Sequence, residues 1–390
     1  MKIGLYGPGL LQLAIGLRDI GINGVHFLID KDNPSLSAGI SSEPALNDPS
    51  FAEVDSWETK RSFLFPDSSL LAKRLREFDV LLLSDVGVMF GPGSSRPYIF
   101  FPAGYDLTAL PFPWRAKELR NRGLPDIKAG VVSFQQKRGI VNATGVWTYG
   151  FRPFREALQR LGLPAPKPGD YLPVAFDHEL FSYSEPVDRD DESAKALYVL
   201  HPSRLLMRRT EFLEDIGRNK RNELLFEGIA KTIESGNRVK LVMIERDSSS
   251  DIELAKQWLD QLGIADCVTW IPRDMREGLN HLRMVELYRE CDVVADDFGA
   301  GWFGGVALEG ASIGRPVVNK IEPETMSSLY PEHPFLHAST ADEIRSRLES
   351  LVDPVYRRSV GELSSMWAVK HHGRENVAHR CLRMLERLSV

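Results

Sequence analysis

Short apolar runs alternate with amphipathic segments along the first half of the chain. Runs rich in β-branched and aromatic residues predict buried strands, and the segments between them have the spacing of helices. The predicted strands are 2–6, 24–30, 79–85 and 96–101, and the predicted helices are 10–21 and 70–78. This alternation is typical of a parallel sheet with helices on both faces.

The same pattern resumes at Ala196 and is clearer there. The predicted strands are 196–201, 239–245, 267–271, 292–296 and 316–319, and the predicted helices are 222–236, 252–263, 282–291 and 306–313. We therefore expect an α/β protein with two Rossmann-like domains. The predicted limits are 1–181 for the first domain, 182–195 for a polar, acidic linker and 196–365 for the second domain. Residues 366–390 include an amphipathic helix, opened by His371 and His372, that could cross back to the first domain.

Composition narrows the class of protein. The chain has 390 residues, of which 43% are hydrophobic and 26% charged, with a net charge of −6. These values are typical of a folded soluble protein and argue against general binding of nucleic acid. The three cysteines, Cys267, Cys291 and Cys381, form no CxxC pair, so we expect reduced thiols.

The amino-terminal residues lead directly into a predicted strand, so no secretory signal is expected. The longest apolar run, around residues 80–90, is too short to span a bilayer. We expect a cytoplasmic protein with at most peripheral membrane contact. The nine histidines show no metal-ligand spacing, and the acidic run 188–192 is expected to be solvated, so no metal site is predicted.

A basic cluster follows the strand 196–201. Arg204 comes directly after it, and Arg218, Lys220 and Arg221 precede the next helix. Cations at a helix N-terminus interact unfavourably with the helix dipole, and an anion that lies between them would offset this cost. A diphosphate held by one Arg, one Lys and the helix N-terminus fits this pattern, and a solvated basic turn is the alternative.

The stretch DDFGAGWFGGVALEG, residues 296–310, contains five glycines. Asp296 and Asp297 end a strand, and the glycine loop after them would let backbone N–H groups approach a ligand closely. The Trp302–Phe303 pair within it is expected at the surface. Glu309, one turn into the next helix, suits a ribose diol, which offers two donors to a carboxylate. Alternatively, the glycines serve helix–sheet packing and Glu309 is a surface residue.

Gly7 and Gly9 follow the first strand and form part of a dinucleotide fingerprint, with Asp30 at the end of the second strand. Gln12 stands where the third glycine belongs, and Pro8 removes an amide from the loop. These two departures weaken the match, and an NAD-dependent oxidoreductase is kept as the alternative hypothesis.

Several of these motifs together resemble the retaining family-4 glycosyltransferases, which have two facing Rossmann-like domains with a cleft between them, the GT-B fold. In that family an acidic residue, a Gly-rich loop and a Glu precede a small-residue helix that ends in G-x-P-V-V. The first domain ends in a stretch, 171–181, similar to the family's Asp-x-x-x-Phe motif. The matching residues of the second domain are Arg204, Lys220, Asp296, Asp297, Phe298, Gly301, Trp302, Gly304, Gly305, Glu309, Ala311, Gly314, Pro316, Val317 and Val318.

The resemblance implies a metal-independent transfer from a UDP- or GDP-linked sugar, with no other cofactor. Arg204 and Lys220 would stabilise the diphosphate, and domain closure would exclude water. The nucleotide base would lie near Trp270 and Pro272. Other donor contacts are expected from Asp297, Gly301, Trp302, Phe303, Gly304, Gly305 and Glu309. Acceptor contacts are expected from the first domain, at Gly7, Gly9, Asp85 and the loop 102–115.

Two departures from the family pattern concern catalysis. Many members have two glutamates separated by seven residues, and here Gly301 stands in the first position and Glu309 in the second. Many members also have a histidine where this chain has Ala103, which leaves Asp106 as the nearest polar candidate for a catalytic group. A non-catalytic relative that binds nucleotide sugars is therefore a further alternative. The acceptor, whether a saccharide, a lipid-linked molecule or a small molecule, is not specified by the sequence.

Overall fold

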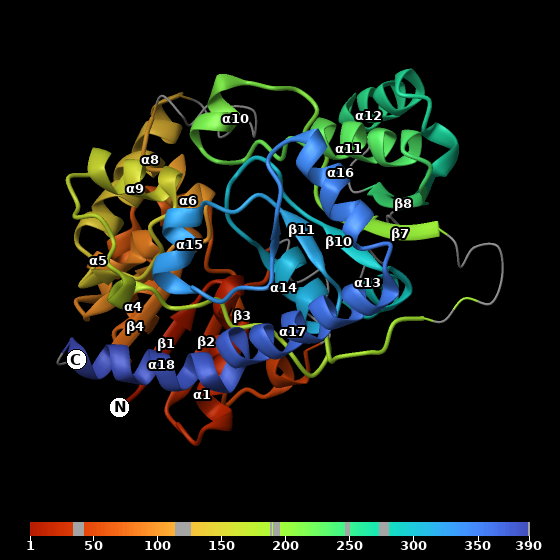
Figure 1. Ribbon diagram of the computed structural model, residues 1–390. Helices are drawn as coiled ribbons and strands as arrows, with labels where there is room; N and C mark the ends of the chain where they lie inside the picture. The colour runs from red at the N-terminus through yellow and green to blue at the C-terminus, as the bar shows by residue number, and fades with distance from the viewer. Residues whose placement is uncertain are drawn as a thin grey trace. The chain divides into compact units, whose positions relative to one another are not determined.

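The computed structural model describes residues 1–33, 43–113, 126–187, 189, 196–245, 250–272 and 281–388. The end of the expected acceptor loop (114–115) and most of the acidic run 188–192 lie outside these residues. The chain divides into two compact units (Figure 1). Unit 1 comprises Met1–Ala175 and Arg374–Val390, and unit 2 comprises Phe176–Gly373.

The described part of unit 1 contains a six-stranded sheet whose strand pairs are all parallel. Its order is β3-β2-β1-β4-β5-β6, so the direction of strand addition reverses between β1 and β4. Ligands of open α/β sheets bind beyond the carboxyl ends of the strands at such a reversal. The strands are β1 (Ile3–Tyr6), β2 (Val25–Asp30), β3 (Ala52–Asp55), β4 (Val80–Ser84), β5 (Tyr98–Phe101) and β6 (Gly145–Val146).

The helices of unit 1 include α1, which begins after a short 3-10 turn, and α18, which comes from the far end of the chain. They are α1 (Leu11–Asp19), α3 (Lys60–Leu64), α4 (Leu70–Leu75), α5 (Gly91–Ser94), α6 (Tyr105–Thr108), α8 (Asp126–Val141), α9 (Arg152–Arg160) and α18 (Arg374–Arg387). The 3-10 turns are η1 (Pro8–Leu10), η3 (Pro44–Asn47), η4 (Pro66–Ser68), η5 (Asp85–Phe90) and η6 (Pro168–Asp170).

The final helix lies beside α1 (Figure 1). Its apolar residues join the core formed by β1, β2, β4 and α1, and they are Val377, Ala378, Cys381, Met384 and Leu385. The predicted start of this helix at His371 is wrong. His371 and His372 end the preceding helix, and Gly373 then adopts an extended conformation (φ −56°, ψ 135°) that separates the two helices.

Unit 2 repeats the topology of unit 1. In the part of it that is described, a six-stranded parallel sheet has the order β9-β8-β7-β10-β11-β12. The strands are β7 (Ala196–His201), β8 (Arg238–Glu245), β9 (Val268–Pro272), β10 (Val293–Ala295), β11 (Val317–Asn319) and β12 (Leu336–His337). The reversal lies between β7 and β10. The predicted α/β class with two Rossmann-like sheets is thus confirmed.

The helices of unit 2 that precede β12 connect successive strands, and two helices follow it. Helices of this unit pack on the sheet and on one another, as the contacts of α11 with β8 and α16 show. The helices are α10 (Glu211–Asp215), α11 (Asn222–Glu234), α12 (Ser250–Gln261), α13 (His281–Glu290), α14 (Gly305–Ser312), α15 (Pro323–Leu329), α16 (Ala341–Ser350) and α17 (Pro354–His372). A 3-10 turn, η8 (Ala265–Cys267), precedes β9.

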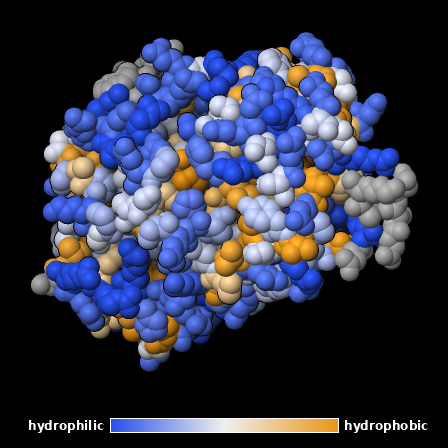
Figure 2. All heavy atoms as spheres, in the orientation of Figure 1, coloured by the Kyte–Doolittle hydropathy of each residue, from blue (hydrophilic) through white to orange (hydrophobic). Residues whose placement is uncertain are grey.

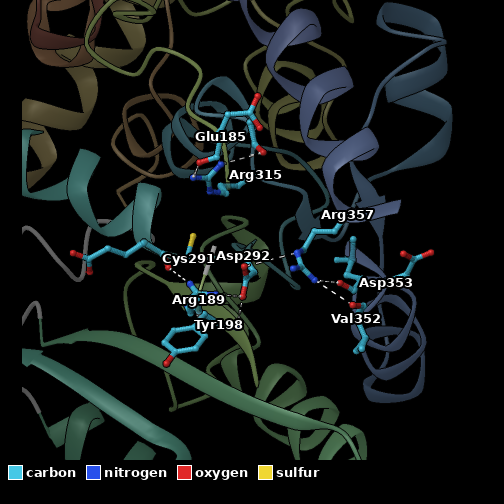
Figure 3. Close-up of polar contacts among 12 residues, drawn as sticks. Glu185, Arg189, Tyr198, Cys291, Asp292, Arg315, Val352, Asp353 and Arg357 are labelled. Carbon is cyan, nitrogen blue, oxygen red and sulfur yellow. Dashed lines mark hydrogen bonds and ion pairs between the residues drawn. The ribbon is translucent and has the colours of Figure 1, made fainter. Parts of the chain in front are cut away.

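Polar contacts tie Glu185 and Arg189 to the amino-terminal side of this sheet (Figure 3). The carboxylate of Asp292 accepts hydrogen bonds from Arg189 and from the N–H group of Tyr198, both at 2.9 Å. Arg315, only 1% exposed, donates to the carbonyl oxygen of Ser184 at 2.9 Å. Buried charges need such partners, so this network is structural.

Polar residues cover most of the face shown in Figure 2, and apolar residues lie among them in small patches. Within the described ranges, no helix combines the length and apolar character needed to cross a bilayer.

The crossing of α1 and α18 gives a test of the fold. A Cβ atom at Gly16 would lie 2.4 Å from the carbonyl oxygen of Arg374. We expect Gly16→Ala to lower the free energy of unfolding by about 1–3 kcal/mol, because a backbone atom cannot yield easily. Gly130→Ala in α8 is the matched control, since nothing lies within 4 Å of its Cβ position. Its higher helix propensity should raise stability by up to about 1 kcal/mol. Urea denaturation measures both, and equal effects would contradict the close contact.

Candidate functional site

The loops that follow β7 and β10 lie at the strand reversal of unit 2, because these strands are neighbours. The loop after β7 carries Arg204 and, before α11, Lys220. The loop after β10 is the glycine stretch 296–305. The structure thus brings the two predicted clusters of this unit to one edge of one sheet.

His201 and Asn222 hold the loop after β7. Both side chains are fully buried. His201 Nδ1 lies 2.8 Å from the carbonyl oxygen of Ala295, and its Nε2 lies 2.8 Å from Asn222 Nδ2. A carbonyl only accepts, so Nδ1 carries the proton and Nε2 accepts from the amide. Asn222 Oδ1 in turn accepts from the N–H group of Leu206 at 2.9 Å. The exposed Arg204 therefore projects from a fixed loop.

Lys220 and Asp297 form the central ion pair of this edge. The Lys220 Nζ–Asp297 Oδ2 distance is 2.5 Å, and the side chains are 27% and 5% exposed. Asp297 Oδ1 accepts from the N–H groups of Gly299 and Ala300, each at 2.8 Å. Burial lowers the pKa of Lys220, but the charges of Asp297 and Asp296 outweigh it, so the pKa lies above its ordinary value. Lys220 is thus a fixed cation at neutral pH.

Gly299 allows the two loops to touch. A Cβ atom at this position would lie 1.7 Å from the carbonyl oxygen of Asn219, so no other residue fits. The N–H group of Phe298 donates to the carbonyl oxygen of Lys220 at 3.1 Å. Arg221 adopts a left-handed conformation (φ 52°) directly before α11. This glycine therefore serves the close packing of two loops. The helix–sheet packing left open as the alternative applies to Gly310, whose Cβ atom would lie 2.7 Å from Val294 Cγ2, while Gly304 and Gly305 are exposed.

The expectation that Trp302 and Phe303 lie at the surface is wrong. Their side chains are 6% and 5% exposed, and their rings stack at 4.6 Å. Phe303 also packs on Phe335 at 4.9 Å and on Trp367 at 5.6 Å. The pair anchors the glycine loop to α17, so any contact of Phe303 with a donor would involve its backbone.

Glu309 is a residue of α14, and its side chain lies near the first residue of that helix. Its Oε2 accepts from the hydroxyl of Tyr288 at 2.8 Å, and its Oε1 lies 3.7 Å from the Cβ position of Gly305. Gly304, the N-cap of α14, supplies no side-chain cap to the first N–H groups of the helix. Such N–H groups favour an anion. The sequence identified Glu309 but gave no signal for Tyr288.

Trp270 and Pro272 lie in β9, which is separated by the strand β8 from β7, where the strand reversal begins. The Trp270 ring lies on the side of α12, with Lys256 Nζ 5.3 Å from its centroid, and Pro272 is exposed at the end of the strand. The structure gives neither residue a contact with Lys220, Asp297 or Glu309, so their role in binding the base stays a prediction.

In unit 1, Gly7 and Asp85 follow the two strands at the reversal. Gly7 has φ 118°, and its Cβ position lies 3.1 Å from that of Ser84. Asp85 has a left-handed conformation (φ 54°), which is uncommon for a residue with a side chain. Gly9 is exposed, with nothing within 4 Å of its Cβ position.

Asp106 holds the Asp85 turn. Its carboxylate, 1% exposed, accepts from the N–H groups of Asp85 at 3.1 Å, Ala103 at 3.0 Å and Gly104 at 2.7 Å. Gln136, fully buried, donates to the carbonyl oxygens of Asp85 and Asp106. Burial and the charge of Asp85 raise the pKa of Asp106 to about 7, although the hydrogen bonds from these N–H groups lower it. This geometry favours a positioning role for Asp106, and its predicted contact with reacting atoms stays a prediction.

The carboxylate of Asp30 would bind a ribose if this protein bound a dinucleotide, but here it forms hydrogen bonds with the protein backbone. It accepts from the N–H groups of Asp32 at 2.9 Å and Glu58 at 2.5 Å. Pro8 begins η1 and offers no amide. The oxidoreductase alternative is therefore not favoured.

Within the described ranges, no three or more His, Cys, Asp or Glu side chains form a group able to hold a metal ion. Burial raises the pKa of the Cys291 thiol to about 12, so this cysteine is not a thiolate.

Glu58 makes the stability of unit 1 depend on pH. It accepts a hydrogen bond from the Tyr6 hydroxyl at 2.7 Å, and burial, with smaller contributions from Asp30 and Asp85, raises its pKa to about 7. The folded state thus binds the proton more tightly than the unfolded state. This proton binding stabilises the fold fully below the ordinary pKa of a glutamic acid, and the stabilisation is lost as the pH rises from there to about 7. Gln stays neutral at every pH. We therefore expect the free energy of unfolding of Glu58→Gln, relative to that of the natural protein, to be about 2 kcal/mol higher at pH 8 than at pH 5. Denaturant unfolding at both values checks this, and a difference independent of pH would contradict it.

Comparisons with known proteins support the fold. Neither the scan against protein-family models nor the search of curated protein sequences gave a match. Solved structures do match over the full chain. Anabaena Alr3699/HepE in complex with UDP-glucose has a TM-score of 0.61 at 16% identity, covering 100% of this chain and 99% of its own. The sucrose-phosphate synthase of Thermosynechococcus elongatus has a TM-score of 0.63 at 14% identity, with 100% and 99% covered. The lipopolysaccharide outer core galactosyltransferase WaaB has a TM-score of 0.58 at 13% identity, with 99% of each chain covered. The chain therefore has the GT-B fold that these structures share.

Proposed function

We propose that this protein is a glycosyltransferase that uses a nucleotide-diphosphate sugar, UDP- or GDP-linked, as the donor. The observation that carries the proposal is the convergence of three features at one strand reversal. They are the cations Arg204 and Lys220, the glycine stretch with the start of α14, and the carboxylate of Glu309. A fold shared with HepE, whose structure contains UDP-glucose, supports the same class of donor.

In the proposed reaction the bond between the anomeric carbon and the diphosphate oxygen breaks, and the electron pair leaves with the diphosphate. The acceptor hydroxyl oxygen bonds to that carbon, and its proton passes to the departing diphosphate oxygen. Lys220, held as a cation by Asp297, and the exposed Arg204 stabilise the charge that develops on the leaving diphosphate. Electrostatic stabilisation by groups fixed in advance is commonly the largest contribution to catalysis.

The backbone N–H groups around Gly304 and Gly305 would bind the diphosphate at the start of α14. Glu309, positioned by the Tyr288 hydroxyl, would accept hydrogen bonds from the two ribose hydroxyls. The base would lie toward Trp270 and Pro272. No step in this scheme requires a metal ion, because the two cations supply the positive charge.

We assign acceptor recognition to unit 1, at Gly7, Gly9 and Asp85. Asp106 and Gln136 fix the backbone of Asp85, and strained backbone maintained in this way is typical of functional positions. Retention of the anomeric configuration is part of the proposal and rests on the family resemblance of the donor motifs.

The leaving-group assignment is tested by Arg204→Ala and Lys220→Ala. We expect each to weaken binding of UDP-glucose at least tenfold in calorimetry, because each removes a cation from the diphosphate. Lys231→Ala is the control, since Lys231 pairs with Asp342 on the surface of α11. GDP-mannose is measured in parallel to decide between the bases.

Thermal unfolding shows whether each variant folds, which matters for Lys220 because its loss leaves the buried Asp297 unpaired. If folded Arg204→Ala and Lys220→Ala variants bind the nucleotide sugar as tightly as the natural protein, the assignment is wrong. Slow release of glucose from UDP-glucose by the natural protein distinguishes an enzyme from a non-catalytic binding relative.

A further inference from the structure

The side chain of Glu322 occupies the space beside Gly301. Gly301 is buried and has a left-handed conformation (φ 89°). A Cβ atom there would lie 3.0 Å from Glu322 Cγ and 3.6 Å from Glu322 Oε1. A larger residue at position 301 would therefore require both a strained backbone and a displaced Glu322.

Two hydrogen bonds hold Glu322 at this place, and a third holds its loop. Its N–H group donates to the carbonyl oxygen of Gly301 at 2.8 Å. Its Oε2 accepts from the hydroxyl of Thr325, a buried residue of α15, at 3.0 Å. Two residues earlier, the N–H group of Lys320 donates to the carbonyl oxygen of Asp297 at 2.8 Å. The loops after the neighbouring strands β10 and β11 thus form one layer, and the Glu322 carboxylate has a defined position on it.

The glycine stretch consequently has a carboxylate at each end. Glu322 contacts the position of Gly301, and Glu309 Oε1 lies 3.7 Å from the Cβ position of Gly305. Between Gly301 and Glu309 in the sequence, the N–H groups at the start of α14 favour an anion. A nucleotide sugar has the same sequence of groups, because its diphosphate lies between two sets of hydroxyls, those of the ribose and those of the sugar.

We propose that Glu322 binds hydroxyl groups of the transferred sugar, while Glu309 binds those of the ribose. Glu322 is then a specificity-determining residue for the donor, and this inference rests on the function proposed above. A carboxylate accepts hydrogen bonds from adjacent hydroxyls but repels phosphate. Glu322 therefore favours a nucleotide that carries a sugar over the same nucleotide without one.

The test compares UDP with UDP-glucose by calorimetry for the natural protein and for Glu322→Gln and Glu322→Ala. We expect both variants to bind UDP within about twofold of the natural protein or more tightly, since no contact with UDP is lost. Binding of UDP-glucose should weaken about tenfold, the loss expected for charged hydrogen bonds. If the natural protein prefers GDP, then GDP and GDP-mannose replace this pair.

Two control variants separate the sugar end from the rest of the site. Glu324→Gln alters an exposed residue in the first turn of α15 and should change neither affinity. Glu309→Gln should weaken UDP and UDP-glucose by the same factor, because both contain the ribose. Retained UDP binding by the Glu322 variants also shows that they are folded.

The inference is overturned if Glu322→Gln and Glu322→Ala lose UDP and UDP-glucose equally, or if they lose neither. It is also overturned if the natural protein binds UDP-glucose no more tightly than UDP, a result that leaves the donor site itself intact. Failure of the natural protein to bind any of the four nucleotides would instead overturn the proposed function, and the inference with it.

Discussion

The edge of the unit 2 sheet that carries Lys220 and the glycine stretch depends on the absence of one side chain. Only glycine at position 299 lets the loop after β10 lie against the carbonyl oxygen of Asn219, to which a Cβ atom would approach within 1.7 Å. That contact brings Lys220 to Asp297 and lets the N–H groups of the loop turn toward the same carboxylate. The ion pair, the glycine stretch and the start of α14 are consequently connected by direct contacts, which suits the proposed binding of a charged ligand without reorganisation.

Much of this arrangement could be predicted from the sequence, because strong local patterns specify it. Most strands of the two sheets follow apolar runs, whereas the short strands β3, β6 and β12 show no such run and are not predicted. The sequence also points to Gly299, Lys220 and Glu309, because glycine, lysine and glutamate each suit one of the contacts expected there. The burial of Trp302 and Phe303 could not be predicted, since their partners Phe335 and Trp367 lie 32 or more positions later and only the fold brings them together. The same limit applies to Glu322, which reaches Gly301 from the next loop.

Acidic groups have different functions in the two units. In unit 2, Asp297 is paired with a cation and several backbone donors, so its charge is matched locally. In unit 1, Glu58 and Asp106 are buried near Asp30 and Asp85, and burial raises the pKa of both toward neutrality. A carboxyl group that changes its charge near pH 7 can exchange a proton with a hydroxyl. The carboxylate of Asp106 also fixes the backbone of Asp85, and its contact with a substrate stays a prediction.

The place of α18 in the core of unit 1 has a consequence for biosynthesis. The ribosome completes residues 1–175 long before it makes the helix that supplies Val377, Cys381 and Leu385 to their core. Unit 2 is continuous in sequence, so all of its strands and helices emerge before that helix does. The unit synthesised first is therefore the last to close its core, and its partly covered apolar surface persists while residues 176–373 are made. Such a surface is a natural substrate for chaperones that bind nascent chains.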